Sequence, residues 1–351
     1  MDRDLQARID ALARRRKDAG ESDPHSSAEV ARALRSHRRA AAGKAGGGRA
    51  PLAGEPAGAG NPTTPSPGPH PEALLADTPG AIVYRRDLPR RDAGPRSAPG
   101  RAGSSLRLED AVDGTEVLHP CGGRAFETLT RVDELEGARR FSHHFGTRLG
   151  EAASPAGRRI AAATSLEGVA PADLLFFDIE TTGLSNSPLF LIGAMVWEGG
   201  GLVVRQYMAR NYAEEAAVIA LFGDLCRSRR LLVSFNGKSF DLPFIRVRAA
   251  ANRVALASTP AAHFDLLHEC RRVWREVLPD CRLQTLELHV CRRLRRGDIP
   301  SAEIPRAYHQ YVRTADAGEM VEVLKHNMLD LVTLADLMTR LPPMGEPEGG
   351  A

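Results

Sequence analysis

The sequence lacks several features that would place a protein in a class at once. No apolar run approaches the roughly 20 residues that a helix needs to span a bilayer, and the N-terminal stretch MDRDLQARID has no apolar core of a signal peptide. Only 5 of the 351 residues are cysteines, an odd number without paired CxxC spacing, so we expect reduced thiols rather than disulfides or a zinc site. These absences lead us to expect a soluble cytoplasmic protein without a membrane partner.

The sequence also lacks a large net charge: positive and negative side chains nearly balance, and the formal net charge is only +3. The first fifty residues hold twelve Lys/Arg against seven Asp/Glu, which leaves −2 for the rest of the chain. Leu5, Ile9 and Leu12 have helical spacing beside the basic run Arg14 to Lys17. We interpret residues 1–40 as a basic tail with a short amphipathic helix; a solvated tail without a helix is the alternative.

Composition divides the rest of the chain. Residues 41–105 are rich in Gly, Pro, Ala and Ser, and such a segment cannot bury enough apolar surface to offset the entropy of ordering. We predict a disordered linker there and a disordered tail at 343–351. Residues 106–170 contain TEVLHPCGGRAFETLTRV, which predicts two short strands around a turn, in a small β-containing appendage. The main domain is predicted at 171–342.

The main domain alternates strand and helix signals. DLLFFDI, LFLIGAMVW and GLVVRQYMA predict three strands, and EGGG between the last two is typical of a hairpin turn. A helix over 213–228, a fourth strand at RLLVSF, a helix over 239–252 and a short strand at HFDLL follow, and the remainder to 341 is predicted to be mostly helix. This order predicts an α/β fold in which helices flank a mixed sheet.

Four acidic residues stand where their apolar neighbours predict burial. Asp178 and Glu180, in LLFFDIETTGL, are two residues apart on a strand, so their side chains point to the same face near its end. Asp241 follows the fourth strand after a tight NG turn, and it approaches the pair if the first and fourth strands are neighbours. Asp330 lies on a helix with an apolar stripe, and His326, four residues earlier, shares its face.

Such a cluster requires compensation. Two carboxylates 4 Å apart repel each other by about 4 kcal/mol at an effective dielectric of 20, and divalent cations remove that conflict. Carboxylate oxygens select hard ions, so we expect Mg²⁺ or Mn²⁺, and two ions about 3.5–4 Å apart can hold the attacking and leaving oxygens of a phosphodiester. Taken singly, each acid also has a plainer interpretation as the end of a surface strand, a helix cap or an ordinary helix acid.

Three motifs occur in the order DIETTGL, NGKSFD and HNMLD. Their order and local context resemble the three exonuclease motifs of the DEDD, or DnaQ-like, branch of the ribonuclease H-like superfamily. Segments such as FLIGAMV, LLVSFNGKSFDLPFIRVR and GDIPSAEIPRAYHQYVR are similar to those of the bacterial YprB family. The resemblance runs from about residue 106 to residue 341, and it implies a ribonuclease H-like mixed sheet and a 3′–5′ exonuclease that acts on DNA or RNA.

The resemblance also implies roles for single residues. Asp178, Glu180, Asp241 and Asp330 would be the metal ligands, and His326 would orient or deprotonate the attacking water. One departure concerns the histidine, which members of the branch commonly place five residues before the last aspartate, whereas His326 is four before Asp330. The alternative is a histidine that hydrogen-bonds only a phosphate or its helix neighbours.

Five further residues would contact nucleic acid by the same resemblance. Thr181, Thr182 and Leu184 would contact the terminal nucleotide, and a plain strand-ending turn is the alternative for them. Asn236 and Lys238 would hold the scissile strand, with Lys238 as a phosphate-positioning charge, although the turn alone explains Asn236.

Two further segments are ambiguous. Asp265 in HFDLL is a candidate supporting acid, and His263, His268 and Cys270 beside it imitate a metal tract but match no usual zinc spacing. The basic run CRRLRRGD, Cys291 to Asp298, is interpreted either as a segment that tracks a nucleic-acid backbone or as a solvated helix end.

The sequence therefore predicts a metal-dependent nuclease with a two-metal mechanism and nucleic acid as its partner. Two alternatives remain open, namely a non-catalytic nucleic-acid-binding module on the same fold and a structure-specific endonuclease. The four intact acids favour the enzyme, since a degenerate domain is free to lose them.

Overall fold

The computed structural model describes residues 82–84, 106–120, 123–151, 154–184, 187–256, 259–295 and 297–344. The predicted basic tail at 1–40 lies outside them. So do the predicted linker at 41–105, except for 82–84, and the predicted tail at 343–351, except for 343–344. Among the helices that the structure describes, none is both long and apolar enough to cross a membrane.

Seven strands form one mixed sheet in the order β2-β3-β6-β5-β4-β7-β8. Neighbours from β2 to β4 pair antiparallel, whereas β4, β7 and β8 pair parallel. The pairing of β4 with β7 supplies the neighbour relation on which the approach of Asp241 depends. The strands are β2 (Gly114–Leu118), β3 (Arg124–Arg131), β4 (Leu174–Thr181), β5 (Leu189–Glu198), β6 (Gly201–Met208), β7 (Leu231–Ser234) and β8 (Ala262–Asp265).

Helices flank this sheet, which confirms the predicted fold class. The described α-helices are α4 (Leu108–Ala111), α5 (Phe141–Gly150), α6 (Pro155–Thr164), α7 (Glu215–Cys226), α8 (Asp241–Ala251), α9 (Leu266–Trp274), α10 (Leu283–His289), α11 (Ile304–Thr314) and α12 (Gly318–Arg340). Three short 3-10 turns are η1 (Val132–Glu134), η2 (Pro171–Asp173) and η3 (Tyr212–Glu214).

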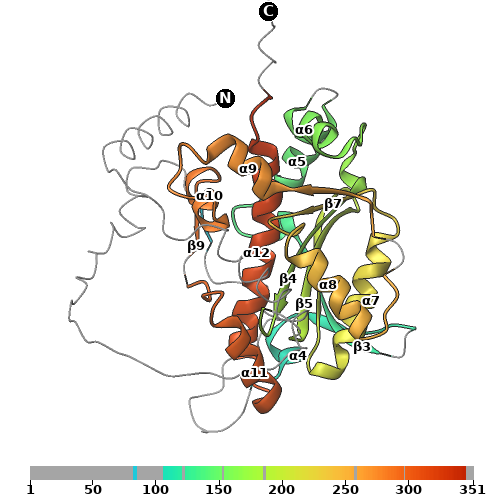
Figure 1. The fold of residues 1–351 in the computed structure, drawn as a ribbon. Helices are drawn as coiled ribbons and strands as arrows, with labels where there is room; N and C mark the ends of the chain where they lie inside the picture. Colours follow the sequence, from blue (N-terminus) through green and yellow to red (C-terminus); the bar gives the residue numbers. More distant parts are fainter. Residues whose placement is uncertain are drawn as a thin grey trace, which may run out of the picture. The chain divides into compact units, whose positions relative to one another are not determined.

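Strand β4 lies inside the sheet and is covered on both faces, which explains its nearly continuous apolar sequence. Phe176 packs edge-on against Phe145 of α5, with ring centroids 5.8 Å apart. Phe177, one residue later, packs on Phe222 of α7 at 5.4 Å. Because successive strand residues point to opposite faces, α5 and α7 lie on opposite sides of the sheet. Figure 1 shows α12 along one side of β4 and β5, with α7 and α8 on the other.

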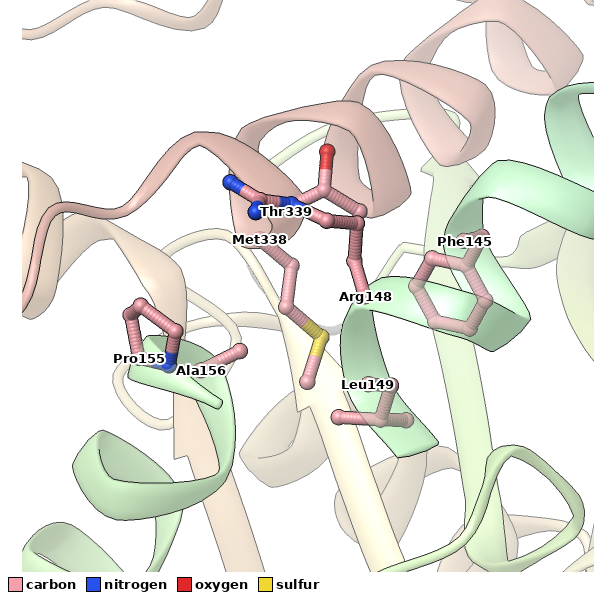
Figure 2. A pocket seen from close by; sticks show the side chains of 7 residues that line it. All are labelled: Phe145, Arg148, Leu149, Pro155, Ala156, Met338 and Thr339. Atoms are coloured by element: carbon pink, nitrogen blue, oxygen red, sulfur yellow. The ribbon is translucent and has the colours of Figure 1, made fainter. Parts of the chain in front are cut away.

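The long helix α12 is buried on nearly all sides, as its two apolar sides predict. It contacts β4, β5 and β6, and also α4, α5 and α6. At its C-terminal end, Met338 reaches between Leu149 of α5 and Ala156 of α6 and lines a small pocket there (Figure 2). The helix is therefore fixed along its whole length, which fixes any side chain that it directs at β4.

The hairpin between β5 and β6 forms at the predicted place. Its two loop residues, Gly199 and Gly200, have φ values of +56° and +81°, the left-handed conformation that two-residue hairpin loops require and that glycine adopts without strain.

The segment at 106–170 contains the two predicted strands, β2 and β3. However, β3 also pairs antiparallel with β6, with Phe126 opposite Met208. The hairpin thus extends the main sheet, and the boundary predicted at residue 171 does not divide the sheet.

A second, two-stranded sheet was not predicted. Strand β1 (Ile82–Tyr84) lies in the range predicted as linker and pairs parallel with β9 (Arg293–Arg295), which lies in the range predicted to be mostly helix. A segment far away in sequence therefore lies beside the strand that carries two arginines.

Candidate active site

The first two acids lie at the C-terminal end of β4. Asp178 and Glu180 lie two and four residues after Phe176, so all three side chains point to the same face of the sheet. This is the face of α5, which α12 also covers. The pairing with β5 shifts register between Glu180 and Thr181. Such an irregularity ends regular pairing and redirects the side chains beside it.

Asp241, the third acid, is the first residue of α8 and is buried. Asp265 holds the turn that precedes Asp241, because its carboxylate accepts the backbone N–H groups of Asn236 (2.8 Å) and Lys238 (3.0 Å). The same carboxylate caps α9 by accepting the N–H of Leu267 (3.1 Å). The predicted supporting acid is thus placed as a structural anchor of the β7–α8 turn.

The fourth acid, Asp330, and His326 come from successive turns of α12. The Nε2 atom of His326 lies 3.6 Å from an Asp330 carboxylate oxygen, so the two residues share a face as predicted. The His326 side chain is 5% exposed and that of Asp330 is 15% exposed.

Burial and like charge raise the pKa of the three acids at this end of the sheet. The pKa of Asp178 lies well above its usual value because of burial and the charges of Asp330, Glu180 and Asp241. Burial and the charges of Asp330 and Asp241 raise the pKa of Glu180 to about 8, against the opposing charge of His326. Burial likewise raises the pKa of Asp241 to about 7, against backbone hydrogen bonds. The structure therefore brings the four predicted acids into one another's electrostatic field.

Asp178, Glu180 and Asp241 form no ion pair with any Lys, Arg or His of the described residues. Nor do three or more His, Cys, Asp or Glu side chains in the described part of the chain stand close enough together to hold a metal ion where they lie. In donor chemistry the carboxylates fit a hard divalent cation, since they offer only oxygen ligands and a bound cation would favour the ionised form that burial disfavours.

A row of residues across four strands supports Asp178. Opposite one another lie Asp178 on β4, Gly193 on β5, Gln206 on β6 and Thr128 on β3. A Cβ on Gly193 would lie 2.0 Å from the side-chain oxygen of Asn327 on α12. The missing side chain therefore makes room for Asn327 to reach the sheet.

Asn327 fills that room and binds Asp178. Its Nδ2 donates to Asp178 Oδ2 at 2.9 Å, while its Oδ1 accepts from Gln206 Nε2 at 2.9 Å. The amide of Gln206 is oriented in turn, because its Oε1 accepts from Thr128 Oγ1 at 3.1 Å and its Nε2 also donates to the Leu324 carbonyl at 2.7 Å. These hydrogen bonds fix the orientation of both side-chain amides, Gln206 and Asn327. One oxygen of Asp178 is therefore held by Asn327, and the other is left for the site.

On the side of the cluster that α12 forms, the side chains of Arg295 and His326 lie beside Asp330. The guanidinium of Arg295 on β9 lies 2.6 Å from Asp330 Oδ1 and 2.7 Å from Glu287 Oε2. Asp298 bridges the group, with one oxygen 2.9 Å from His326 Nδ1 and the other 3.3 Å from Arg295 Nη1. This half of the cluster is compensated without any added ion.

The same contacts set the charges on this side. Burial alone would lower the pKa of His326, but the hydrogen bond to Asp298 and the charges of Asp330 and Asp298 raise it to about 9. Burial would raise the pKa of Asp298, yet the hydrogen bond with His326 and the charges of His326 and Arg295 lower it. His326 therefore carries a proton at neutral pH when no metal is bound.

The predicted nucleic-acid contacts lie around the same strand ends. Thr181 Oγ1 donates to the Gly183 carbonyl (2.8 Å) and Thr182 Oγ1 to the Pro188 carbonyl (3.2 Å), so both hydroxyls serve the turn after β4. Leu184 is 84% exposed. Asn236 and Lys238 are exposed on the β7–α8 turn, where Asn236 adopts a φ of +65°. Leu184 and Lys238 are thus free to meet a ligand.

The structure corrects the two interpretations of CRRLRRGD. Arg293 and Arg295 lie in a strand, their side chains are only 2% and 5% exposed, and both form ion pairs with acids of α12. Neither a solvated helix end nor a surface track fits such buried guanidinium groups. Periodicity missed them because three residues are too few to show a strand.

Gln206, Asp298 and Asn327 were also not predicted as part of the site. One signal was present for Asn327, namely Gly193 in the middle of an apolar strand, since an interior glycine marks a close approach. Among the described residues, Cys226, Cys270 and Cys291 are buried and form no disulfide.

Comparison with known proteins gives a family model and a curated relative. A model described as the RNase_H superfamily matches residues 175–342. The uncharacterized protein YprB of Bacillus subtilis (strain 168) is 33% identical over 178 residues, which is 49% of this chain and 43% of that protein. The chain therefore spans less than half the length of this curated relative.

Two solved structures show weaker likeness. The family B DNA polymerase of Pyrobaculum calidifontis is 18% identical, with a TM-score of 0.40 over 49% of this chain and 25% of that one. E. coli Exonuclease I, solved in complex with a dT13 oligonucleotide, is 16% identical, with a TM-score of 0.29 over 45% of this chain and 42% of that one. With TM-scores below 0.5, these likenesses do not bear on function.

The family model ends two residues after α12, so its match spans the part of the chain that carries all four acids. Residues 175–342 therefore match the RNase_H superfamily, and the chain is similar to YprB over about half of its length.

Proposed function

We propose that this domain is a metal-dependent nuclease that hydrolyses phosphodiester bonds in nucleic acid, as a 3′–5′ exonuclease. The observation that carries the proposal is the half-compensated cluster, in which Asp178, Glu180 and Asp241 share one another's field and form no ion pair with a described Lys, Arg or His. A site of this kind gains strongly from two divalent cations and from the phosphate that such cations attract.

Mg²⁺ or Mn²⁺ bound there would supply Lewis-acid stabilisation of the phosphate and a reactive water. Asp178, Glu180, Asp241 and Asp330 would hold the ions. Asp178 would offer the oxygen that Asn327 does not bind, and Asp330 the oxygen that faces His326.

His326 would act on the water or on the phosphate. Its Nδ1 is engaged by Asp298, so Nε2 is the nitrogen that faces the cluster. The proton that His326 carries without metal suits it to donate to a phosphate oxygen. To act as the general base, His326 would first have to lose this proton, and bound metal ions would favour that loss by lowering its pKa.

The strand ends would receive the substrate. Leu184, which is exposed in the segment after β4, would pack against a terminal base, while Lys238 would pair with a backbone phosphate. Thr181 and Thr182 would act through the turn that their hydroxyls hold, and Asn236 through the shape of its own turn.

A second candidate, a non-catalytic nucleic-acid-binding module, is favoured by one observation. Arg295 already compensates Asp330, so one of the four acids has a stable partner without metal. The two candidates differ in whether the ends of a bound strand are shortened.

The test uses the full chain and its Asp178→Ala/Glu180→Ala variant, with Asp113→Asn as the matched control because Asp113 is an exposed acid outside the site. Substrates are single-stranded DNA, duplex DNA, RNA and hybrid labelled at either end, and circular single-stranded DNA, each with Mg²⁺, Mn²⁺ or EDTA.

We expect a metal-dependent ladder from the 3′ end by wild type and by the control, and none by the double variant. Cutting of the circle would show an endonuclease instead. Retained binding without any shortening would support the binding module and overturn the enzyme.

A further inference from the structure

We propose that Asp298 is a positioning residue of this site, which orients His326 directly and Asp330 through Arg295. The inference deepens the proposed function and rests on it for its catalytic consequence. The geometry itself stands on contacts among described residues and does not depend on any activity.

The first contact fixes the histidine ring. Asp298 Oδ1 lies 2.9 Å from Nδ1 of His326, and a carboxylate at that distance keeps a hydrogen on Nδ1 whether or not Nε2 is also protonated. Nε2, 3.6 Å from Asp330 Oδ2, is then the nitrogen presented to the cluster. Without Asp298 the imidazole could turn about its side-chain bonds and present either nitrogen.

The second contact fixes the last acid. The other oxygen of Asp298 meets Arg295 Nη1 at 3.3 Å, while Nη2 of the same guanidinium lies 2.6 Å from Asp330 Oδ1. Because the guanidinium is planar, holding one of its nitrogens sets the direction of the others. Asp298 and Asp330 therefore constrain each other across one rigid group.

Arg295 is itself anchored and cannot leave easily. Its Nε lies 2.7 Å from Glu287, whose other oxygen accepts from Thr333 Oγ1 of α12 at 3.0 Å. Its side chain is only 5% exposed, and moving it away would leave buried carboxylates without a partner. Asp330 thus keeps one oxygen on Arg295 and can present only the other to the site.

This arrangement bears on the unusual spacing of the histidine. A spacing of four positions places His326 and Asp330 on one face of the helix. The helix alone does not decide which ring nitrogen of His326 meets Asp330. Asp298 arrives from the loop after β9, outside α12, and supplies that decision for both side chains.

The matched control is an acid of α12 that pairs with another arginine of β9. Asp336 of α12 pairs with Arg293 of β9 and with Arg340, so Asp336→Asn removes a buried carboxylate between the same two elements without touching His326. Asp298→Ala removes the proposed function of the side chain. Asp298→Asn keeps an oxygen that can accept from Nδ1 but loses the charge toward Arg295.

The first measurement needs no nuclease activity. In the metal-free full chain with ¹⁵N-labelled histidine, we expect the Nδ1 proton of His326 to exchange more slowly than any proton on its Nε2. The same result is expected in Asp336→Asn and Asp298→Asn, and loss of that protection in Asp298→Ala. A wild-type ring whose Nδ1 carries no proton overturns the proposal, even if Asp298→Ala does not fold.

The second measurement is kinetic, on whichever substrate is shortened. We expect kcat to fall by about 10- to 100-fold in Asp298→Ala, as is typical for loss of a residue that orients a ligand, with KM within about threefold, partial rescue by Asp298→Asn, and no such fall in Asp336→Asn. Equal losses in Asp298→Ala and Asp336→Asn would mean a merely structural role and overturn the proposal. If wild type shortens nothing, the nuclease proposal fails and the exchange measurement still decides the orientation.

Discussion

The two halves of the acidic cluster are compensated in opposite ways. On the β4 side, Asp178, Glu180 and Asp241 form no ion pair with a described Lys, Arg or His, and burial raises their pKa values, although the charge of His326 opposes the rise at Glu180. On the α12 side, Asp330 sits between Arg295 and His326. The comparison teaches where positive charge is missing, namely at the end of β4 and not on α12.

The halves also differ in how they are assembled. The β4 side is built from strand ends that are neighbours in the sheet. The α12 side depends on β9, which belongs to a separate two-stranded sheet. A substitution can therefore change one half and leave the other intact.

The largest effect is expected on the compensated half. Replacing Arg295 by Met should leave Asp330, Glu287 and Asp298 without their shared cation, and breaking a buried ion pair typically costs about 3–5 kcal/mol. Urea denaturation should show that loss in the free energy of unfolding. Arg306→Met is the control, since Arg306 makes a similar pair with Glu319 on the surface, and it should change little. A loss in Arg295→Met no larger than in the control would contradict this view of the α12 half.

A smaller effect is expected where the sheet supports Asp178. In Gly193→Ala the new Cβ would overlap Asn327, and overpacking of this kind costs about 1–3 kcal/mol. The displaced amide would release Asp178. Metal-dependent activity should therefore fall even under conditions where the variant is still fully folded.

The control for that variant is Gly150→Ala, whose Cβ would meet nothing within 4 Å. It lies at the end of α5, where alanine favours helix, so thermal unfolding should show no loss of stability. If Gly193→Ala leaves both stability and activity unchanged, Asn327 does not hold Asp178 in the way described.

The smallest effect is a dependence on pH. An unfolded Glu titrates near 4.5 and Glu180 near 8, so between these values the native state binds more protons and the free energy of unfolding falls as pH rises. Glu180→Gln removes this contribution. In EDTA, its stability relative to wild type should grow by more than about 1 kcal/mol from pH 4.5 to pH 8.

Glu276→Gln serves as its control, because Glu276 is an exposed acid whose side chain is 79% accessible. Its stability relative to wild type should stay level over the same range. Added Mg²⁺ should flatten the wild-type decline as well. A constant difference between Glu180→Gln and wild type would show that folding does not raise the pKa of Glu180.

The β4 half could be predicted from the sequence because each signal is local. Strand alternation places Asp178 and Glu180 together, and an apolar run of the right length predicts the buried strand that carries them. The helical period likewise places His326 and Asp330 on one face of α12. The mixed sheet flanked by helices was predicted and is confirmed, although the hairpin of β2 and β3 proved to extend the main sheet.

The support of these residues could not be predicted because it depends on pairing at long range. Gln206 reaches Asn327 across 121 positions of sequence, and no period or composition links them. Arg293 and Arg295 look like solvated charges in the sequence, since arginine is seldom buried unless paired, and their partners lie on another element. The metal ions and the roles of the site residues stay predictions.

The pairing of β1 with β9 has a practical consequence for anyone who shortens this chain. The recognisable motifs begin at residue 174, and a fragment cut there or at residue 106 would still contain all four acids. Yet that fragment would lack the neighbour of the strand that holds Arg295. The smallest piece that carries the motifs and the smallest piece that carries the native surroundings of Asp330 are different pieces, and the second starts no later than Ile82.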